Sequence, residues 1–133
     1  MAVPTAEQLN VRLAVSYGST LGSERPLLDY TEPDATEVTQ GNVISKELAA
    51  GATDQTVDLS TYVDTLHAIT IEDRSNIGLK VGLAAGGTKF RIAANGAMCI
   101  RWNSSVAPPT LYLDNESGAS KCFLQIGIAG SSS

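Results

Sequence analysis

Residues 89–102, KFRIAANGAMCIRW, contain the strongest fold signal in the chain. Two runs of alternating apolar residues flank the pair Asn95-Gly96, and this arrangement is typical of a β-hairpin. A two-residue turn would put the apolar residues of the two strands on opposite faces, which a half-buried sheet does not tolerate. We therefore predict a three-residue loop, Ala94-Asn95-Gly96, with Gly96 in a left-handed bulge position. In this register the core-face pairs are Phe90 with Ile100 and Ile92 with Met98, and Trp102 also faces the core.

The other face of this predicted hairpin is basic. It carries Lys89, Arg91, Cys99 and Arg101. Lys89 would lie directly opposite Arg101, and like charges placed in this way destabilise a sheet. We therefore treat Lys89, Arg91 and Arg101 as a candidate interaction face, which is either covered by acidic groups or left as an ordinary solvated charged surface.

The acidic groups that could cover this face lie in residues 22–37, GSERPLLDYTEPDATE. This segment contains two prolines and has no hydrophobic period, so we predict a long surface loop or arm. We hypothesise that the arm, from the same chain or from a neighbour, covers the basic face. Its acidic residues are Glu24, Asp29, Glu32, Asp34 and Glu37.

The charge of the chain is divided between its two halves. Residues 1–73 hold 12 Asp and Glu against 3 Lys and Arg, a net charge of −9, and residues 74–133 hold 2 against 6, a net charge of +4. The sum is the −5 of the whole chain. An acidic half and a basic half could neutralise each other within one chain, meet between subunits, or face different partners.

Alternation with a period of two dominates the rest of the sequence, which predicts an all-β chain folded as an antiparallel β-sandwich. Its length of 133 residues suits a single domain over residues 1–133, with an extended N-terminal arm. A first strand is expected over residues 9–15, a strand broken by Gly41 over 38–44, and one helical turn over 45–51. The other expected strands are residues 55–59, 66–72, 77–83, 88–93, 97–102, 110–114 and 121–129.

A weak internal repeat runs through these strands. ITIEDRSN (69–76) leads into LKVG (79–82), and LYLDNESG (111–118) leads into LQIG (124–127). Each copy is a strand, a polar turn and a second strand that ends in glycine. This pattern fits either a duplication or two unrelated antiparallel hairpins.

No catalytic, cofactor or metal motif is recognisable, so we predict that the protein is not an enzyme and needs no cofactor. His67, the single histidine, has no nucleophile at a recognisable spacing, which favours a structural role. The acidic pairs Glu72-Asp73 and Asp114-x-Glu116 are oxygen-rich, but such residues are also ordinary at turns, and we predict no metal site. The glycine-rich residues 82–90 lack the spacing of a phosphate-binding loop.

Partners and compartment are constrained only by general features. Cys99 and Cys122 are expected to be free thiols, because the N-terminus lacks the pattern of a signal peptide. We expect no membrane span, since no apolar run reaches about 18 residues. We also expect no nucleic-acid binding, since the chain is acidic overall.

Three stretches carry a family resemblance: residues 56–82, residues 88–102 and residues 111–130. Together they resemble small virion structural proteins of tailed bacteriophages, in which a polar DxS or NxS turn follows a strand and the last strand ends in glycine. The resemblance implies a jelly-roll-like sandwich that acts as a capsid decoration (cement) protein. It also implies a homotrimer bound to the major capsid protein and located in the virion after assembly in the host cytoplasm. The alternative is a tail- or fibre-associated recognition module, such as a carbohydrate-binding β-sandwich.

Overall fold

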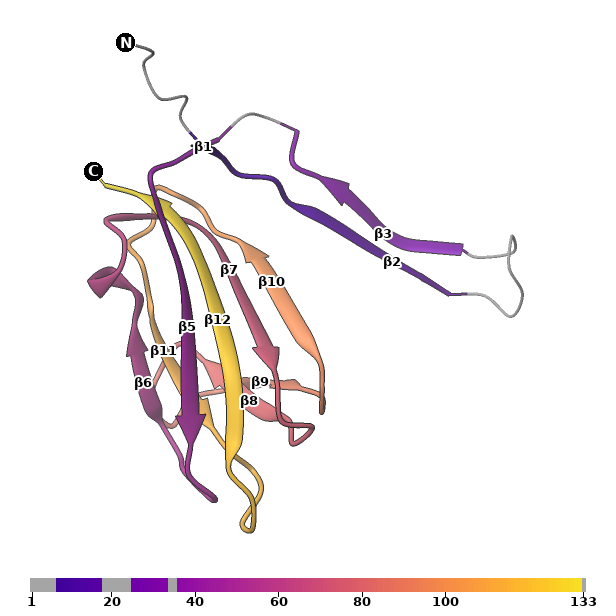
Figure 1. The fold of residues 1–133 in the computed structure, drawn as a ribbon, viewed down its shortest axis with the longest axis vertical. Helices are drawn as coiled ribbons and strands as arrows, with labels where there is room; N and C mark the ends of the chain where they lie inside the picture. Colours follow the sequence, from indigo (N-terminus) through magenta and orange to yellow (C-terminus); the bar gives the residue numbers. More distant parts are fainter. Residues whose placement is uncertain (1–6, 18–24, 34–35, 133) are drawn as a thin grey trace. The chain divides into compact units, whose positions relative to one another are not determined.

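The computed structural model describes residues 7–17, 25–33 and 36–132, and the chain divides into two compact units, Met1–Val38 and Thr39–Ser133. Both units consist of antiparallel strands (Figure 1). In the first unit β1 (Glu7–Gln8) pairs with β4 (Glu37–Val38), and β2 (Arg12–Tyr17) pairs with β3 (Arg25–Thr31). That residues 1–133 form a single domain stays a prediction.

The second unit contains eight strands and one short 3-10 helix, η1 (Leu59–Thr61). Seven of these strands fall where the alternating pattern predicts them, to within a few residues. The strands are β5 (Gln40–Leu48), β6 (Gln55–Asp58), β7 (Thr65–Asp73), β8 (Leu79–Gly82), β9 (Lys89–Ile92), β10 (Ala97–Arg101), β11 (Thr110–Asp114) and β12 (Cys122–Ser131).

The strand pairs of the second unit nest inside one another. β5 pairs with β12, β6 with β11, β7 with β10 and β8 with β9, so the first strand meets the last and the two middle strands meet each other. Two further pairings complete the four-stranded sheets β10-β7-β12-β5 and β6-β11-β8-β9, which pack face to face (Figure 1). Eight strands wound in this way form a jelly roll. The predicted antiparallel β-sandwich is therefore confirmed.

The core lies between the two sheets and follows the period-two alternation. Along β12 the buried residues are Cys122, Leu124, Ile126 and Ile128, while the residues between them lie on the outer face. Each fully buried Leu or Ile contributes about 2 kcal/mol of transfer free energy. The core is completed by buried aliphatic residues from the other strands, among them Leu48, Val57, Leu66, Ile69, Ile71, Leu79, Val81, Leu111 and Leu113.

The predicted hairpin of residues 89–102 is wrong in its pairing. β9 pairs with β8 and β10 pairs with β7, so the two strands belong to different sheets. A turn is present at these residues, with Gly96 N donating to Ala93 O at 2.7 Å, but the left-handed residue is Asn95, with a φ of 58°, and not Gly96 as predicted. This turn carries the chain from one sheet to the other. The predicted core-facing side is confirmed for Ile92, which is buried, and for Met98, which packs against the core, but Phe90, opposite Val81, is 73% exposed.

The buried carboxylate of Asp73 explains why this turn forms a corner. Asp73 N donates to Gly96 O at 2.9 Å, and Asn95 N donates to Asp73 Oδ2 at 2.9 Å. The same Oδ2 accepts from Ile77 N and Gly78 N, both at 3.0 Å. Asp73 therefore joins two corners, residues 73–78 between β7 and β8 and residues 93–96 between β9 and β10.

The pKa of Asp73 reflects this network. Burial favours the neutral acid and raises the pKa, but hydrogen bonds from the backbone N–H groups of Asn95, Ser75 and Gly78 and from the Ser75 hydroxyl outweigh burial. The pKa of Asp73 consequently lies well below its ordinary value. The carboxylate is charged at neutral pH and accepts every one of these hydrogen bonds.

The corner between β11 and β12 is organised in the same way by Asn115. Its side-chain amide donates to Leu48 O, Ala49 O and Ser120 O, and its Oδ1 accepts from Ser117 N at 2.9 Å. The two copies of the predicted repeat are therefore two sheet-crossing corners, each started by a buried Asp or Asn. Neither is a hairpin, since β7 does not pair with β8 and β11 does not pair with β12.

Two further expectations are wrong. The helical turn predicted over residues 45–51 is instead the end of β5, followed by a turn in which Ala52 N donates to Ala49 O and Gly51 has a φ of 70°. Within the 22–37 segment, residues Arg25–Thr31 form β3, which pairs with β2, so the expected lack of regular structure is wrong for those residues. In the described part of the chain, no helix is long and apolar enough to cross a membrane.

His67 and the two cysteines lie in the second unit. The buried His67 contacts Ser104 Oγ through Nδ1 at 2.8 Å and Ser131 Oγ through Nε2 at 3.3 Å, so it links three segments, as its predicted structural role requires. Both cysteines are free thiols, as predicted, and burial raises the pKa of each.

We expect Asp73→Asn to lower the free energy of unfolding by about 3 kcal/mol, because the introduced amide nitrogen cannot accept the backbone hydrogen bonds that Oδ2 now accepts. Urea denaturation at pH 7 measures the change. Asp58→Asn, at the exposed cap of η1, is the control and should cost less than half as much. Equal losses in the two variants would contradict the role assigned to Asp73.

The deficit of Asp73→Asn should also depend on pH. A carboxylate whose pKa is lowered by folding stabilises the native state above its unfolded pKa of about 3.9, and this stabilisation is lost as the pH falls toward the lower native pKa. The difference between wild type and Asp73→Asn should therefore shrink by about 1 kcal/mol between pH 7 and pH 3. A difference that stays constant over this range would count against the charged network.

Candidate functional site

The three basic residues of the predicted interaction face do not lie together. Lys89 and Arg91 project from the outer face of the β6-β11-β8-β9 sheet, opposite Gly82 and Lys80. Arg101 belongs to β10 in the other sheet, where its guanidinium donates to His67 O at 2.7 Å. The separation follows from the corner at residues 93–96. Whether these residues contact a partner stays a prediction.

Lys89 is held between two carboxylates of its own unit. Its Nζ lies 2.7 Å from Asp54 Oδ1 and 3.3 Å from Asp114 Oδ2, and its side chain is 8% exposed. The hydrogen bond lowers the pKa of Asp54 and raises the pKa of Lys89. Gly82 makes room for the lysine, since a Cβ at that position would lie 2.7 Å from Lys89 Cγ.

The charge of Arg91 is also paired with a carboxylate of the same unit. Glu116 Oε1 lies 3.2 Å from both the Arg91 guanidinium and Lys80 Nζ, so one carboxylate separates two neighbouring cations. These pairs are partly exposed and add little stability. The acids that neutralise Lys89 and Arg91 are thus Asp54, Asp114 and Glu116. The hypothesis that the 22–37 segment supplies these acids is not supported by the ion pairs of either cation.

The acidic residues of the 22–37 segment lie in or beside the first unit's strands where they are described. Asp29 is exposed on β3, Glu37 is exposed on β4, and Glu32 accepts a hydrogen bond from the Tyr30 hydroxyl at 3.1 Å. Glu24 and Asp34 lie outside the described residues.

The most distinctive surfaces of the second unit are its two open sides. Each sheet ends in two edge strands, β5 and β10 in one sheet and β6 and β9 in the other. Because β5 is followed by β6 and β9 by β10, the four edges meet in two pairs, and each pair borders a cleft between the sheets. One cleft is polar and the other is apolar.

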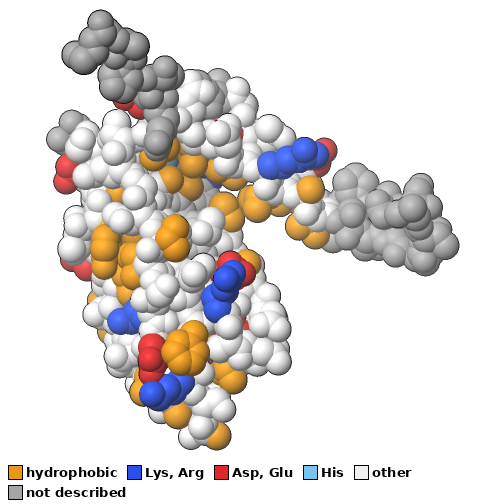
Figure 2. Space-filling model, viewed as in Figure 1, with side chains coloured by type: hydrophobic (Ala, Val, Ile, Leu, Met, Phe, Trp, Pro, Cys, Tyr) orange, Lys and Arg blue, Asp and Glu red, His pale blue; other side chains and the backbone are white. Residues whose placement is uncertain are grey.

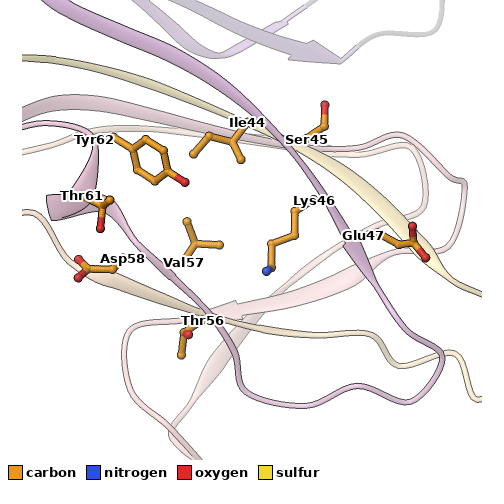
Figure 3. A pocket seen from close by; sticks show the side chains of 9 residues that line it. All are labelled: Ile44, Ser45, Lys46, Glu47, Thr56, Val57, Asp58, Thr61 and Tyr62. Carbon is orange, nitrogen blue, oxygen red and sulfur yellow. The ribbon is translucent and has the colours of Figure 1, made fainter.

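The polar cleft lies between β5 and β6 and has a volume of about 330 Å³. Figure 3 shows Lys46, Ile44, Val57 and Tyr62 directed into this cleft from its opposite walls, while Glu47 points away. Lys46 lies opposite the buried Leu124 in the sheet, which places it on the inner face of an edge strand.

The apolar cleft lies between β9 and β10 and has a volume of about 180 Å³. Its lining contains no charged side chain. At its mouth Phe90 is 73% exposed and Leu83 is 56% exposed, so two large apolar side chains face solvent. The side chains that line it also include Val81, Met98, Ile100 and Trp102.

The two clefts differ in how their strand edges are protected. An inward-pointing charge on an edge strand prevents another strand from pairing there, because pairing would bury the charge. Lys46 provides this protection on β5. The inner positions of β9 and β10 are Phe90, Ile92, Met98 and Ile100, and none of them is charged. The β9–β10 edge is therefore the open edge of the sandwich, and it is the candidate interaction site.

The sequence pattern contains the signal for Lys46, although the predicted helical turn hides it. Ile44, Lys46 and Leu48 alternate with Val43, Ser45 and Glu47, so the lysine stands at an inward position of a strand. The outer face of the β10-β7-β12-β5 sheet, seen in Figure 2, has hydrophobic side chains and charges of both signs interspersed. In residues 7–17, 25–33 and 36–132, no cluster of three or more His, Cys, Asp and Glu side chains is placed to hold a metal ion.

No protein-family model matches the sequence, and no curated protein matches it. Among solved structures, the Schizosaccharomyces pombe Cnp3 cupin domain is similar, with 13% sequence identity and a TM-score of 0.47. The match covers 90% of this chain and 83% of that domain. The jelly-roll assignment of the chain rests on its own nested strand pairs.

We expect Lys46→Val to expose β5 and β6 to pairing with other chains, because it removes the inward charge from that edge. Sedimentation velocity should then detect species larger than the wild-type species, increasing with concentration. Lys46→Arg keeps the charge and should sediment as wild type. Identical sedimentation of the valine variant and the wild type would argue against a protective role for Lys46.

Proposed function

We propose that the chain is a non-enzymatic structural protein that acts by binding other protein subunits, as a capsid decoration (cement) protein of a phage virion does. Its partners are then further copies of itself, as a homotrimer, and the major capsid protein. The virion is its location. The observation that carries this proposal is the open apolar edge between β9 and β10.

The support from this edge is physical. A strand edge that combines unpaired backbone groups with exposed apolar side chains is a ready template for another chain, and monomeric proteins normally protect such edges. Phe90 and Leu83 lose their contact with water only when another surface covers them. The contrast with the β5–β6 edge, where Lys46 points inward, supports the proposal that the β9–β10 edge binds another chain.

The jelly roll is compatible with the proposal without deciding it. Viral capsid subunits, lectin domains and cupins all use this architecture. Function must therefore be argued from the surfaces that the fold carries. The long-lived contacts expected of a building block need a large apolar interface, and the β9–β10 edge offers its centre.

The polar cleft favours one alternative, a carbohydrate-binding module. Tyr62 provides an aromatic ring, and Lys46 and Thr56 provide polar groups, around a volume of about 330 Å³. A small polar ligand could be held by these groups. Binding of glycans to the purified chain, lost in Tyr62→Ala and retained in Phe90→Lys, would favour this alternative over the assembly proposal.

We expect light scattering to give a mass of about three times the 13.9 kDa of one chain. Phe90→Lys should weaken this association by about thirtyfold or more, because it puts a charge at the centre of the apolar contact. Val43→Lys is the matched control, since Val43 is also 73% exposed but lies on the outer face of β5. A monomer at every concentration, or equal weakening by the two variants, would overturn the proposal.

A further inference from the structure

The side chain of Lys46, in the polar cleft, differs from every other cation of the second unit. Within residues 39–132 its ammonium group forms no ion pair and no hydrogen bond with a described residue, although the side chain is half-buried. The other cations of these residues each contact a carboxylate or a backbone carbonyl, and they are Arg74, Lys80, Lys89, Arg91, Arg101 and Lys121. Lys46 therefore keeps its full capacity to pair with an anion from outside the chain.

The two acids that line the polar cleft are engaged elsewhere. Glu47 points away from the cleft (Figure 3), and its Oε1 lies 2.9 Å from Lys121 Nζ. Asp58 caps η1, because its Oδ1 accepts from Ser60 N at 3.0 Å and from Ser60 Oγ at 2.6 Å. Neither carboxylate lies within ion-pair distance of Lys46, so the positive charge in the cleft is not neutralised by its own lining.

The wall opposite Lys46 carries an aromatic ring and hydroxyl groups. Tyr62 follows η1, where its backbone N–H donates to the carbonyl of the buried Leu59 at 3.0 Å, and its ring packs against the core. Thr56 and Thr61 also line the cleft. Among the described residues, the hydroxyls of these three side chains have no hydrogen-bond partner. The cleft thus holds one unpaired cation facing one ring and several unpaired hydroxyls (Figure 3).

These groups match a particular ligand chemistry. One lysine suits the single charge of a carboxylate, whereas a phosphate is normally met by several backbone N–H groups or an arginine fork. An aromatic side chain with a hydroxyl contacts the apolar face of a small ring and also hydrogen-bonds its polar edge. The volume of about 330 Å³ is at the lower end for small-molecule sites, which are about 300–1,000 Å³. A single carboxylated, hydroxylated ring fits this description.

We propose that the polar cleft binds an acidic monosaccharide, a carboxylated pyranose such as a uronic or sialic acid. Its carboxylate pairs with Lys46, its ring lies against Tyr62, and its hydroxyls bond to the threonine and tyrosine hydroxyls. The inference rests on the carbohydrate-binding alternative named above and specifies the ligand class. The cleft is on the other open side of the sandwich from the β9–β10 edge, so a bound sugar leaves that edge free.

The test titrates the isotope-labelled full-length chain with glucuronate, N-acetylneuraminate or the neutral sugar glucose, and follows the backbone amide signals by NMR. We expect shifts confined to residues 44–47 and 56–62. Both acidic sugars should bind about tenfold or more tightly than glucose, because only they form a charge-assisted hydrogen bond. Acetate, which has the carboxylate without the ring, should bind about tenfold or more weakly than glucuronate.

Lys46→Glu should abolish the preference for the acidic sugars, since it reverses the charge in the cleft while keeping the edge of β5 charged. Lys46→Arg should retain the preference. The matched control is Lys80→Glu, which makes the same change of charge on β8, outside the cleft, and should bind glucuronate as wild type does. Tyr62→Ala should weaken binding of every sugar. Circular dichroism confirms that each variant is folded.

The outcomes separate the ligand class from carbohydrate binding itself. If glucose binds as tightly as the acidic sugars, or if Lys46→Glu and Lys80→Glu behave alike, the acidic ligand is wrong while carbohydrate binding stands. If no sugar shifts the amides of the cleft, or if acetate binds as tightly as glucuronate, the carbohydrate-binding alternative fails as well.

Discussion

The carboxylate of Asp73 is the interaction on which the arrangement of the second unit depends. A single buried side chain accepts hydrogen bonds from the corner that follows β7 and from the corner that precedes β10. Because both corners cross between the sheets, Asp73 holds together the points at which the chain leaves β7 and enters β10. The low pKa of Asp73 means that its charge is balanced by the dipoles of backbone N–H groups at neutral pH.

The open edge between β9 and β10 results from the corner at residues 93–96. Had residues 89–102 formed a hairpin, β9 and β10 would pair and leave no cleft between them. Since the turn at 93–96 is bound to Asp73, the two strands separate into different sheets and their outer edges stay free. The apolar residues that a hairpin would hide in the core then line a cleft, with Phe90 exposed at its mouth.

Local patterns in the sequence predict the strands and their inward faces, because side-chain alternation depends only on neighbouring residues. The sandwich class follows from those strands. The pairing of β9 with β8 could not be predicted, since Asn95-Gly96 is compatible with a hairpin and with a corner, and the choice depends on a hydrogen bond that Asn95 N donates to Asp73, 22 residues away. For the same reason local patterns do not identify the acids beside Lys89, because Asp54 and Asp114 are brought to it by long-range pairing.

The central claim is that copies of the chain associate through the open β9–β10 edge, and amide hydrogen exchange at low and high protein concentration tests it most directly. The account predicts that the amides of β9 and β10 exchange more slowly at high concentration, while the amides of β5 and β6, the edge that carries Lys46, do not change. Equal protection of both edges, or no change at either edge, would contradict it.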